Sequence, residues 1–389
     1  MKPARPGRKL VKAVARFDLR NSLKLGIVLA VIGALIVYFD NPPGRQTDTG
    51  SLGGLTYYGQ AAGRVAPPLE GISHWLNGGP VEMEALRGKV VLVDFWTYSC
   101  VNCVRTFPYL RDWHYKYADK GLVIIGVHTP EFEFEKVRAN VEEAVQRYEL
   151  PYLVAMDNDR RTWRAYENRY WPRDYLIDKT GMIRYDHIGE GDYETTEQWI
   201  QVLLAETGVS LPDTAVKEGP QVAPEHLARL TRELYGGYDF GVFGFGSRDI
   251  GNEIGHMPNQ VVTYSPPDRQ VEGWIYLNGP WFNHSDRLSH AGTSIEDFIQ
   301  VRYYARKAQA VLGSEDGAPV VVTLVLDGAP LDEASRGDDV TLLPDGRSVV
   351  VVDGHRLYNL VSTPDFGTHQ LRLTSDSDRF SFYTFTFGW

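Results

Sequence analysis

The sequence predicts an α/β domain followed by an all-β domain, and three observations support this. The chain has 389 residues and is 43% hydrophobic, which is too long for one ordinary domain and apolar enough for two cores. Within residues 69–207, short apolar runs alternate with amphipathic helical stretches. Within residues 227–389, apolar and polar residues alternate between turn signals, which is typical of strands.

The N-terminal segment predicts a membrane anchor. Residues 1–24 carry eight lysines and arginines against Asp18 alone, although the whole chain has a net charge of −10. An uninterrupted apolar run follows over residues 25–39, somewhat short of the ~20 residues that cross a bilayer comfortably. A cleaved signal peptide is the alternative, but no small-x-small cleavage site follows the run. We therefore expect a single transmembrane signal-anchor helix.

This anchor predicts the location of both domains. Positive charge before the span keeps the N-terminus cytoplasmic and places the later residues outside the cytoplasm, in a compartment that permits disulfides. Residues 40–68 and 208–226 are rich in Gly, Pro and polar residues and are expected to be linkers. The remainder of the chain is acidic, so no nucleic-acid partner is expected.

Alternating elements predict the architecture of the first domain. The expected strands are residues 90–95, 123–127, 152–156, 174–178 and 183–188, and the expected helices are residues 100–117, 134–148 and 194–206. Strands that alternate with helices and end in a hairpin and a helix favour a mostly parallel central sheet with helices on both faces.

The only two cysteines, Cys100 and Cys103, lie where an apolar strand runs into a helix. The first sulfur of such a pair sits beside unsatisfied backbone N–H groups at the positive end of the helix, which favours thiolate over thiol. Cys100 is therefore the predicted nucleophile. Cys103, one helical turn further, can attack a mixed disulfide at Cys100, so that the pair cycles between dithiol and disulfide.

Two structural interpretations of the cysteine pair are less favoured. A structural zinc site needs about four ligands, and no second cysteine pair exists. A purely structural disulfide closing so short a loop removes little entropy from the unfolded chain. We expect no metal, and no cofactor besides the redox-active Cys100–Cys103 disulfide.

Residues around the cysteines resemble the thioredoxin family over about residues 65–207. Asp94 precedes Cys100 at the spacing of the family's buried acid, Pro108 matches its helix-kinking proline, and Trp171-Pro172 stands where the family has a cis-proline facing the cysteines. The dipeptide Val101-Asn102 departs from the family's Gly-Pro, and the redox potential depends on it.

The longer intervening segment and the turn at residues 176–181 resemble the membrane-tethered TlpA-like branch and peroxiredoxin relatives. A narrower resemblance, to the extracytoplasmic part of DipZ-type proteins, is carried by the segments at residues 96–103, 126–132, 157–159 and 189–193. In that family the redox domain follows a CcdA-like electron conduit and precedes a carbohydrate-binding-module-like domain. One anchor stands in place of the conduit here, which implies a separate membrane electron donor. The resemblance also suggests cytochrome c maturation or redox control of envelope proteins.

Several residues receive expected roles at the dithiol. An ionised Asp94 would be costly in its apolar strand, so its pKa should be raised, which suits general acid or base work at Cys103. A solvent-facing Asp94 at a strand edge is the alternative. A cis Trp171-Pro172 bond would present its backbone to a substrate peptide, and an ordinary trans proline at a strand entry is the alternative. Trp96 and Trp171 are expected to wall the substrate site, and Val101 and Asn102 are expected to contact substrate as well.

Two further groups near this site are expected to have ordinary structural roles. Glu131, Glu133 and Glu135 alternate with phenylalanines and are expected on a solvated edge. His128 is as readily a satisfied core residue as a proton carrier.

The second domain is expected to be a jelly-roll-like β-sandwich. Expected strands are residues 261–265, 271–278, 298–306, 320–326, 348–353, 370–374 and 380–387. In the third, Ile299, Val301, Tyr303 and Ala305 should face the core, and Gln300, Arg302, Tyr304 and Arg306 should face solvent.

Trp274 and Tyr276 share a polar strand face, as stacking on sugar rings requires. The alternative is that both face the core. The sugar-binding expectation itself comes from the resemblance to DipZ-type proteins.

The function predicted from the sequence is that of a membrane-anchored thiol:disulfide oxidoreductase acting on protein thiols and disulfides. One alternative is a wall- or glycan-tethering protein with a vestigial redox domain. Another is a peroxiredoxin-like peroxidase that uses Cys100, but Thr97-Tyr98-Ser99 lacks the proline that normally precedes a peroxidatic cysteine.

Overall fold

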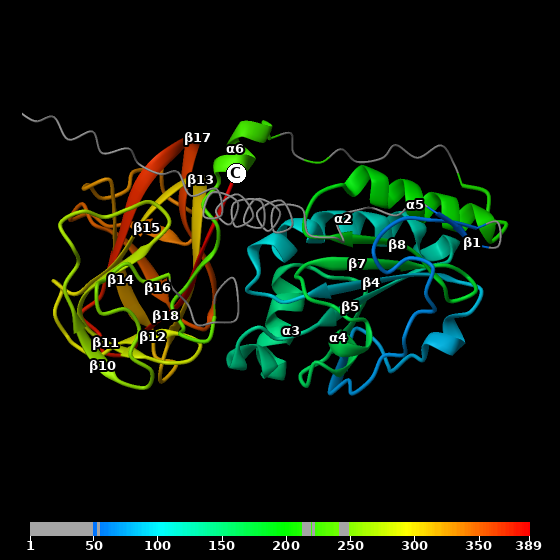
Figure 1. The fold of residues 1–389 in the computed structure, drawn as a ribbon, viewed down its shortest axis with the longest axis horizontal. Helices are drawn as coiled ribbons and strands as arrows, with labels where there is room; N and C mark the ends of the chain where they lie inside the picture. The colour runs from blue at the N-terminus through cyan, green and yellow to red at the C-terminus, as the bar shows by residue number, and fades with distance from the viewer. Residues whose placement is uncertain (1–49, 53–54, 212–218, 220–221, 241–248) are drawn as a thin grey trace, which may run out of the picture. The chain divides into compact units, whose positions relative to one another are not determined.

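The computed structural model describes residues 50–52, 55–211, 219, 222–240 and 249–389 (Figure 1). The described residues up to 60 belong to one unit, and those from 61 onward belong to a second. In the first unit, β1 (Gly50–Leu52) pairs with β2 (Leu55–Tyr57) in an antiparallel hairpin. The predicted basic segment and apolar span lie outside the described residues. Among the residues that are described, no helix is long and apolar enough to cross a membrane.

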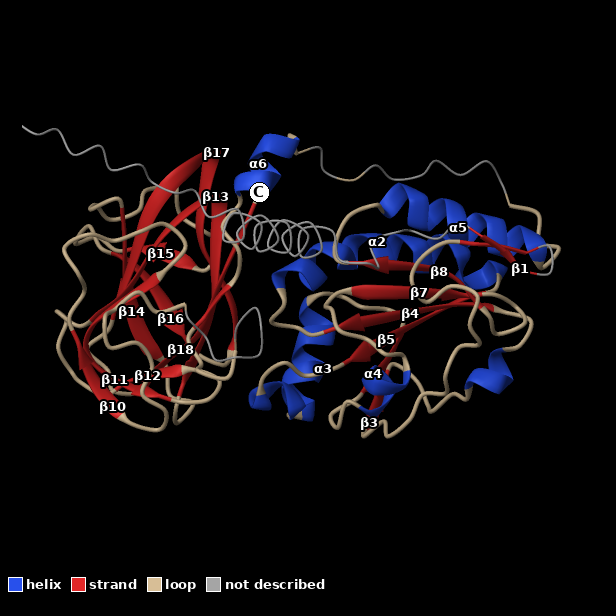
Figure 2. Cartoon of the chain, viewed as in Figure 1, coloured by secondary structure: helices blue, strands red, loops and turns tan. Residues whose placement is uncertain are grey.

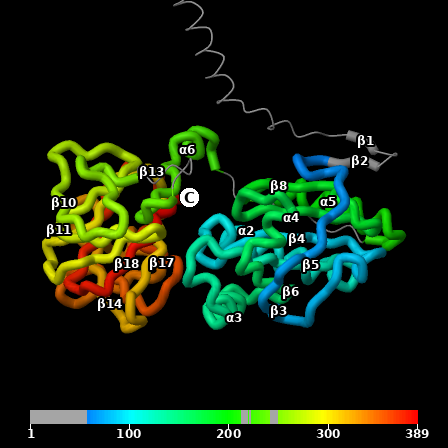
Figure 3. Tube along the Cα trace, turned by 60° about the horizontal axis from the view of Figure 1, so that its bottom comes forward, coloured from blue at the N-terminus to red at the C-terminus, as the bar shows by residue number. Residues whose placement is uncertain are grey.

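The α/β part of the second unit is built on a six-stranded sheet. In spatial order its strands are β3 (His74–Leu76), β6 (Leu153–Met156), β5 (Leu122–His128), β4 (Val90–Trp96), β7 (Arg173–Ile177) and β8 (Ile183–Ile188). The tube in Figure 3 shows this succession from β8 through β4, β5 and β6 to β3. The central β4 is buried along its whole length, because it has sheet neighbours on both edges and packed elements on both faces.

The expectation of a mostly parallel sheet is wrong. Only the β4–β5 and β5–β6 pairings of this sheet are parallel, whereas the β3–β6, β4–β7 and β7–β8 pairings are antiparallel. Helical crossovers join the parallel strands, but β7 and β8 form a hairpin, and β7 enters beside β4 in the opposite direction. A mixed sheet results, and it places β7 directly against the strand that leads to the cysteines.

Four α-helices accompany this sheet (Figure 2): α2 (Val101–Tyr117), α3 (Arg138–Arg147), α4 (Arg161–Ala165) and α5 (Tyr193–Glu206). Three short 3₁₀ turns lie between them: η1 (Met83–Leu86), η2 (Ala118–Lys120) and η3 (Glu133–Lys136). The single helix expected over residues 134–148 is instead η3 followed by α3. Val137 is extended between the two, and this break separates them.

The alternation of side chains along β4 separates two environments. Val91, Val93 and Phe95 belong to a core cluster with Tyr175 of β7 and Trp163 of α4. The intervening residues, Asp94 among them, therefore leave the opposite face of the sheet. There Trp96 packs edge-to-face on Phe107 of α2 at 5.2 Å between ring centroids.

The first core also holds residues that precede the predicted domain start at residue 69. Ala61 and Ala66 are buried in it, and the Ala61 N–H donates to Asp186 of β8 at 2.6 Å. The packed chain of this domain therefore begins within the segment expected to be a linker.

The C-terminal part after the short helix α6 (Pro224–Arg229) is all-β (Figure 2). Its strands are β9 (Leu234–Tyr235), β10 (Val261–Tyr264), β11 (Ile275–Asn283), β12 (Leu288–His290), β13 (Phe298–Ser314), β14 (Val320–Leu326), β15 (Val340–Leu342), β16 (Ser348–Val352), β17 (Arg356–Thr374) and β18 (Phe380–Gly388). They form one ten-stranded hydrogen-bonded sheet rather than two separate sheets. β13 and β17 are continuous where shorter strands were expected, and they carry hydrogen bonding from one half of the sheet into the other.

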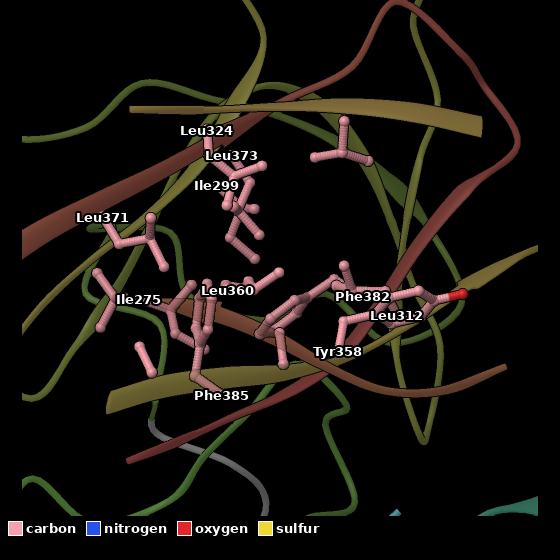
Figure 4. Close-up of a cluster of buried hydrophobic side chains, with 14 of the residues drawn as sticks. Ile275, Ile299, Leu312, Leu324, Tyr358, Leu360, Leu371, Leu373, Phe382 and Phe385 are labelled. Atoms are coloured by element: carbon pink, nitrogen blue, oxygen red, sulfur yellow. The ribbon is translucent and has the colours of Figure 1, made fainter. Parts of the chain in front are cut away.

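An irregularity in β13 changes which residues face the core. Residues 299, 301, 303 and 305 are buried as predicted, and the register then shifts between Ala305 and Lys307. Beyond the shift, the core side chains are Ala308, Ala310 and Leu312, which is the effect of one extra residue in a strand. Figure 4 shows Leu312 beside Phe382 in this core, and Ile299 beside Leu373.

Two residues on the predicted solvent face of β13 are buried instead. Gln300 is bonded to Gln270 and Arg372. Tyr304 lies under α6, where its hydroxyl pairs with His226. A face that alternation assigns to solvent is thus covered by segments that are distant in sequence.

The absence of a side chain at Gly126 is required by the packing above β5. A Cβ there would lie 2.7 Å from Trp96 Nε1 and 3.1 Å from Tyr152 Cε2, and both of those side chains are buried. We predict that Gly126→Ala lowers the free energy of unfolding by about 1–3 kcal/mol through overpacking, measured by urea unfolding. Gly79→Ala is the control, because a Cβ there meets nothing within 4 Å. Equal stability of the two variants would contradict the prediction.

Candidate active site

Cys100 caps the N-terminus of α2. Its backbone is extended, with φ −77° and ψ 111°, and its sulfur accepts a hydrogen bond from the Cys103 N–H at 3.4 Å. Both cysteines are free thiols; Cys100 is partly exposed and Cys103 is fully buried. A protein disulfide from outside can therefore reach Cys100 but not Cys103.

The buried position of Cys103 keeps its thiol protonated. Burial raises the pKa of Cys103 well above its usual value, and the neighbouring Cys100 and Asp94 raise it further. A buried thiol of this kind needs a base before it can act as a nucleophile.

Asp94 is fully buried in β4, on the sheet face that α2 covers. Burial raises its pKa well above the usual value, and the charge of Asp174 on β7 raises it further. Apart from the Asp174 carboxyl, no group of the described residues forms a hydrogen bond with either side-chain oxygen of Asp94. The position is that of a buried acid rather than a solvent-facing one, whereas its role in proton transfer stays a prediction.

The Trp171–Pro172 peptide bond is cis. The Pro172 carbonyl accepts from Gly189 N at 2.9 Å, and Trp171 Nε1 donates to the Thr129 carbonyl at 3.0 Å. Trp171 is half-buried and packs against Trp163 with 4.2 Å between ring centroids and a tilt of 34° between the ring planes.

The four residues predicted to contact substrate differ in accessibility. Trp96 is fully buried and Val101 is 6% exposed, whereas Asn102 and Trp171 keep partly exposed surface. Val101 packs in a cluster with Phe132 and with Leu357 and Tyr383 of the all-β part. A substrate that docks on this structure can therefore touch Asn102 and Trp171, whereas Trp96 and Val101 are already covered by the protein.

Glu135 supports the cysteine loop, a role that sequence analysis missed. It is fully buried rather than on a solvated edge. Its carboxylate accepts from Ser99 Oγ at 2.5 Å and from the backbone N–H groups of Glu131 and Phe132 at 2.5 and 2.9 Å. Because Ser99 precedes Cys100, this carboxylate anchors the approach to the nucleophile.

Glu131 is also paired rather than free in solvent. It accepts a hydrogen bond of 2.9 Å from the Tyr235 hydroxyl. Of the three glutamates expected on a solvated edge, only Glu133 is exposed. The sequence does carry a signal for the buried position of Glu135. A glutamate at the third position of a helix can accept a hydrogen bond from the backbone N–H at the start of that helix.

His128 is a core residue. It is fully buried between Trp96 and Tyr98, and Thr97 Oγ1 lies 3.3 Å from its Nε2. Burial lowers its pKa to about 3, so the imidazole is neutral near pH 7 and does not carry a proton as imidazolium.

The predicted sugar-contacting pair does not form an open platform. Tyr276 is 3% exposed, and its hydroxyl accepts from Val271 N at 2.8 Å. Trp274 is half-buried. Only Trp274 of the pair offers substantial surface, and sugar binding stays a prediction.

The fold and this site define a thioredoxin-fold dithiol protein, with a reachable first cysteine and a buried second one at the start of a helix. Residues 62–186 match the family described as AhpC/TSA, and residues 231–388 match the family described as thioredoxin like C-terminal domain. The chain is 39% identical to Protein DipZ of Mycobacterium tuberculosis over 71% of its own length. That match spans 38% of the length of the DipZ protein.

Two other relatives are matched over most of their own length. Thiol-disulfide oxidoreductase YkuV of Bacillus subtilis is 30% identical over 36% of this chain and 95% of its own. Thiol-disulfide oxidoreductase ResA of Bacillus cereus is 32% identical over 32% of this chain and 70% of its own. The chain therefore belongs to the thioredoxin-like thiol-disulfide oxidoreductases.

We predict that Glu135→Ala destabilises the site and the fold together. It leaves the Ser99 hydroxyl and two backbone N–H groups without their acceptor, at a cost of about 2–4 kcal/mol in free energy of unfolding. Initial rates of disulfide reduction should also fall, because the loop before Cys100 loses its anchor.

The matched control for this variant is Glu133→Ala. Glu133 is exposed and, among the described residues, forms an ion pair with Lys136 alone, so its loss should cost less than about 0.5 kcal/mol. Urea unfolding and an insulin reduction assay measure both effects, and a Glu135→Ala protein as stable and active as this control would contradict the assigned role.

Proposed function

We propose that this protein exchanges disulfides with protein substrates outside the cytoplasm, held at the membrane by its N-terminal segment. The observation that carries the proposal is the asymmetry of the dithiol, with Cys100 partly exposed at a helix N-terminus and Cys103 fully buried behind it. The exchange needs no redox group besides this pair.

The geometry assigns each cysteine one step. The Cys100 thiolate attacks a substrate disulfide, forming a mixed disulfide and releasing the first substrate sulfur as a thiolate. Cys103 then gives its proton to the Asp94 carboxylate and attacks the Cys100 sulfur. That bond forms as the bond from Cys100 to the substrate breaks, and the second substrate thiolate leaves. The substrate is reduced by two electrons, and the cysteine pair becomes a disulfide.

The proposed setting rests on the sequence and on similarity to DipZ. The basic residues 1–24 and apolar residues 25–39 suit a single-pass anchor. Because one such helix cannot relay electrons, a separate CcdA-like membrane protein is the proposed electron donor. Proposed substrates are disulfide-bonded envelope proteins, including apocytochromes c during their maturation.

We predict opposite outcomes for the two cysteine variants. Cys100→Ser removes the attacking sulfur and should abolish dithiothreitol-driven insulin reduction. Cys103→Ser should still form the mixed disulfide but release it poorly, so covalent adducts with a substrate protein accumulate on non-reducing gels. Full insulin reduction by the Cys100→Ser variant would contradict the proposed function.

Peroxide consumption, followed in parallel, tests peroxidase chemistry, because the AhpC/TSA match covers the same residues. The proposal expects rapid disulfide exchange and slow loss of peroxide. Faster turnover of peroxide than of insulin would assign the site to the peroxidase alternative instead.

The anchor gives a further prediction. A variant lacking residues 1–39 should move from the membrane fraction to the soluble fraction and keep its insulin reduction, because the described site contains none of those residues. Fractionation and immunoblotting measure the shift. Equal membrane retention of both forms would contradict anchoring by this segment.

A further inference from the structure

A second acid lies directly beside Asp94. In the antiparallel β4–β7 pairing, Asp94 stands opposite Asp174. Directly opposed residues extend their side chains from the same face of a sheet. Asp174 therefore lies with Asp94 on the face that α2 covers. Its Oδ1 atom is buried, and apart from the Asp94 carboxyl no group of the described residues donates a hydrogen bond to it.

The two carboxyls have no positively charged partner among the described residues. No lysine or arginine in the described part of the chain forms an ion pair with Asp94 or Asp174, and Gly126 stands opposite Asp94 on its other side, in β5. Several titratable or charged groups face or border the pair. They are Cys100 at the N-terminus of α2, Cys103 and Arg111 on α2, Tyr152 before β6, His187 on β8 and Tyr193 on α5.

Two neighbouring buried carboxyl groups cannot both be ionised without a large cost in free energy. Burial raises the pKa of Asp174 to about 7, with a hydrogen bond from Asp94 opposing that rise. The pKa of Asp94 is raised well above its usual value by burial and then by Asp174. Such a pair titrates in two steps that belong to both groups, and between the steps it holds a single proton.

We propose that Asp174 is a positioning residue of the dithiol site, which shares one proton with Asp94 and so keeps a carboxylate ready for the proton of Cys103. The proposal rests on the role of Asp94 as the base in the proposed exchange. A lone buried carboxyl would ionise only at higher pH, whereas in the pair the protonated Asp94 donates a hydrogen bond that stabilises the Asp174 carboxylate.

The proton balance during resolution follows from this arrangement. The S–H bond of Cys103 breaks, and the proton passes to the singly protonated pair, which then holds two protons. The sulfur's electron pair forms the bond to Cys100, and the substrate leaves as a thiolate. One proton then returns to solvent from the Asp174 side, where the neighbouring His187 is partly exposed.

The test compares wild type, Asp174→Val and Asp94→Asn in single-turnover reduction of a peptide disulfide from about pH 5.5 to about pH 9. Asp174→Val leaves one carboxyl with no hydrogen-bonding partner at position 174, and its single ionisation should lie above the first step of the wild-type pair. A rise of about one pH unit reduces the ionised fraction near pH 7 about five-fold, and the rate should fall accordingly. It should recover toward pH 9, whereas Asp94→Asn should stay slow throughout.

Three results would overturn the inference: a profile that superimposes on wild type, a uniform loss at every pH, or a shift to lower pH. The last is expected if Asp174 acts only by repelling charge. The exposed Asp159 supplies the matched control, and Asp159→Asn should leave the profile unchanged. If this test fails, the proposed disulfide exchange is still tested separately by the Cys100→Ser and Cys103→Ser variants.

Folding of the variants is checked independently. An acid with a raised pKa in the folded state binds more protons there than in the unfolded chain, so its contribution to stability falls as pH rises from about 4 upward. Asp174→Val removes that loss and should unfold at the same or a higher urea concentration than wild type at pH 8. A lower concentration would show that the slow rate reflects unfolding and would count against the inference.

Discussion

The burial of Asp94 and Cys103 beneath α2 is the constraint on which the rest of the site depends. A carboxyl and a thiol taken out of water both favour their neutral forms, so the thiol needs a nearby ionised carboxylate to take its proton before it can attack. This requires α2 to be held firmly over β4. Trp96 against Phe107 holds the helix to the strand, and Glu135 holds the loop before Cys100.

The same packing gives the two cysteines different solvent accessibility. Cys100 caps the helix and keeps an accessible sulfur, while one turn later Cys103 is sealed beneath the surface. Val101 between them is covered by Leu357 and Tyr383 of the all-β part. That part therefore covers one side of the cysteine pair, whereas Asn102 and Trp171 keep partly exposed surface.

Local sequence patterns predicted much of the fold and part of the site. The bounds of α2, β8 and α5 follow from apolar periodicity and are close to the expected ranges. Strand direction and sheet continuity were not predictable in this way. The antiparallel entry of β7, the length of β13 and its register shift depend on pairings between segments far apart in the chain.

By itself, the sequence determined that a Cys-x-x-Cys pair opens a helix after an apolar strand that contains one acid, because these are relations between near neighbours. Only the tertiary structure decided which distant groups join them. Asp174 is 80 residues from Asp94 and meets it through the register of β4 and β7, and Glu135 reaches Ser99 across a loop. Register and loop closure are set by the packing of the whole core, and no local pattern records them.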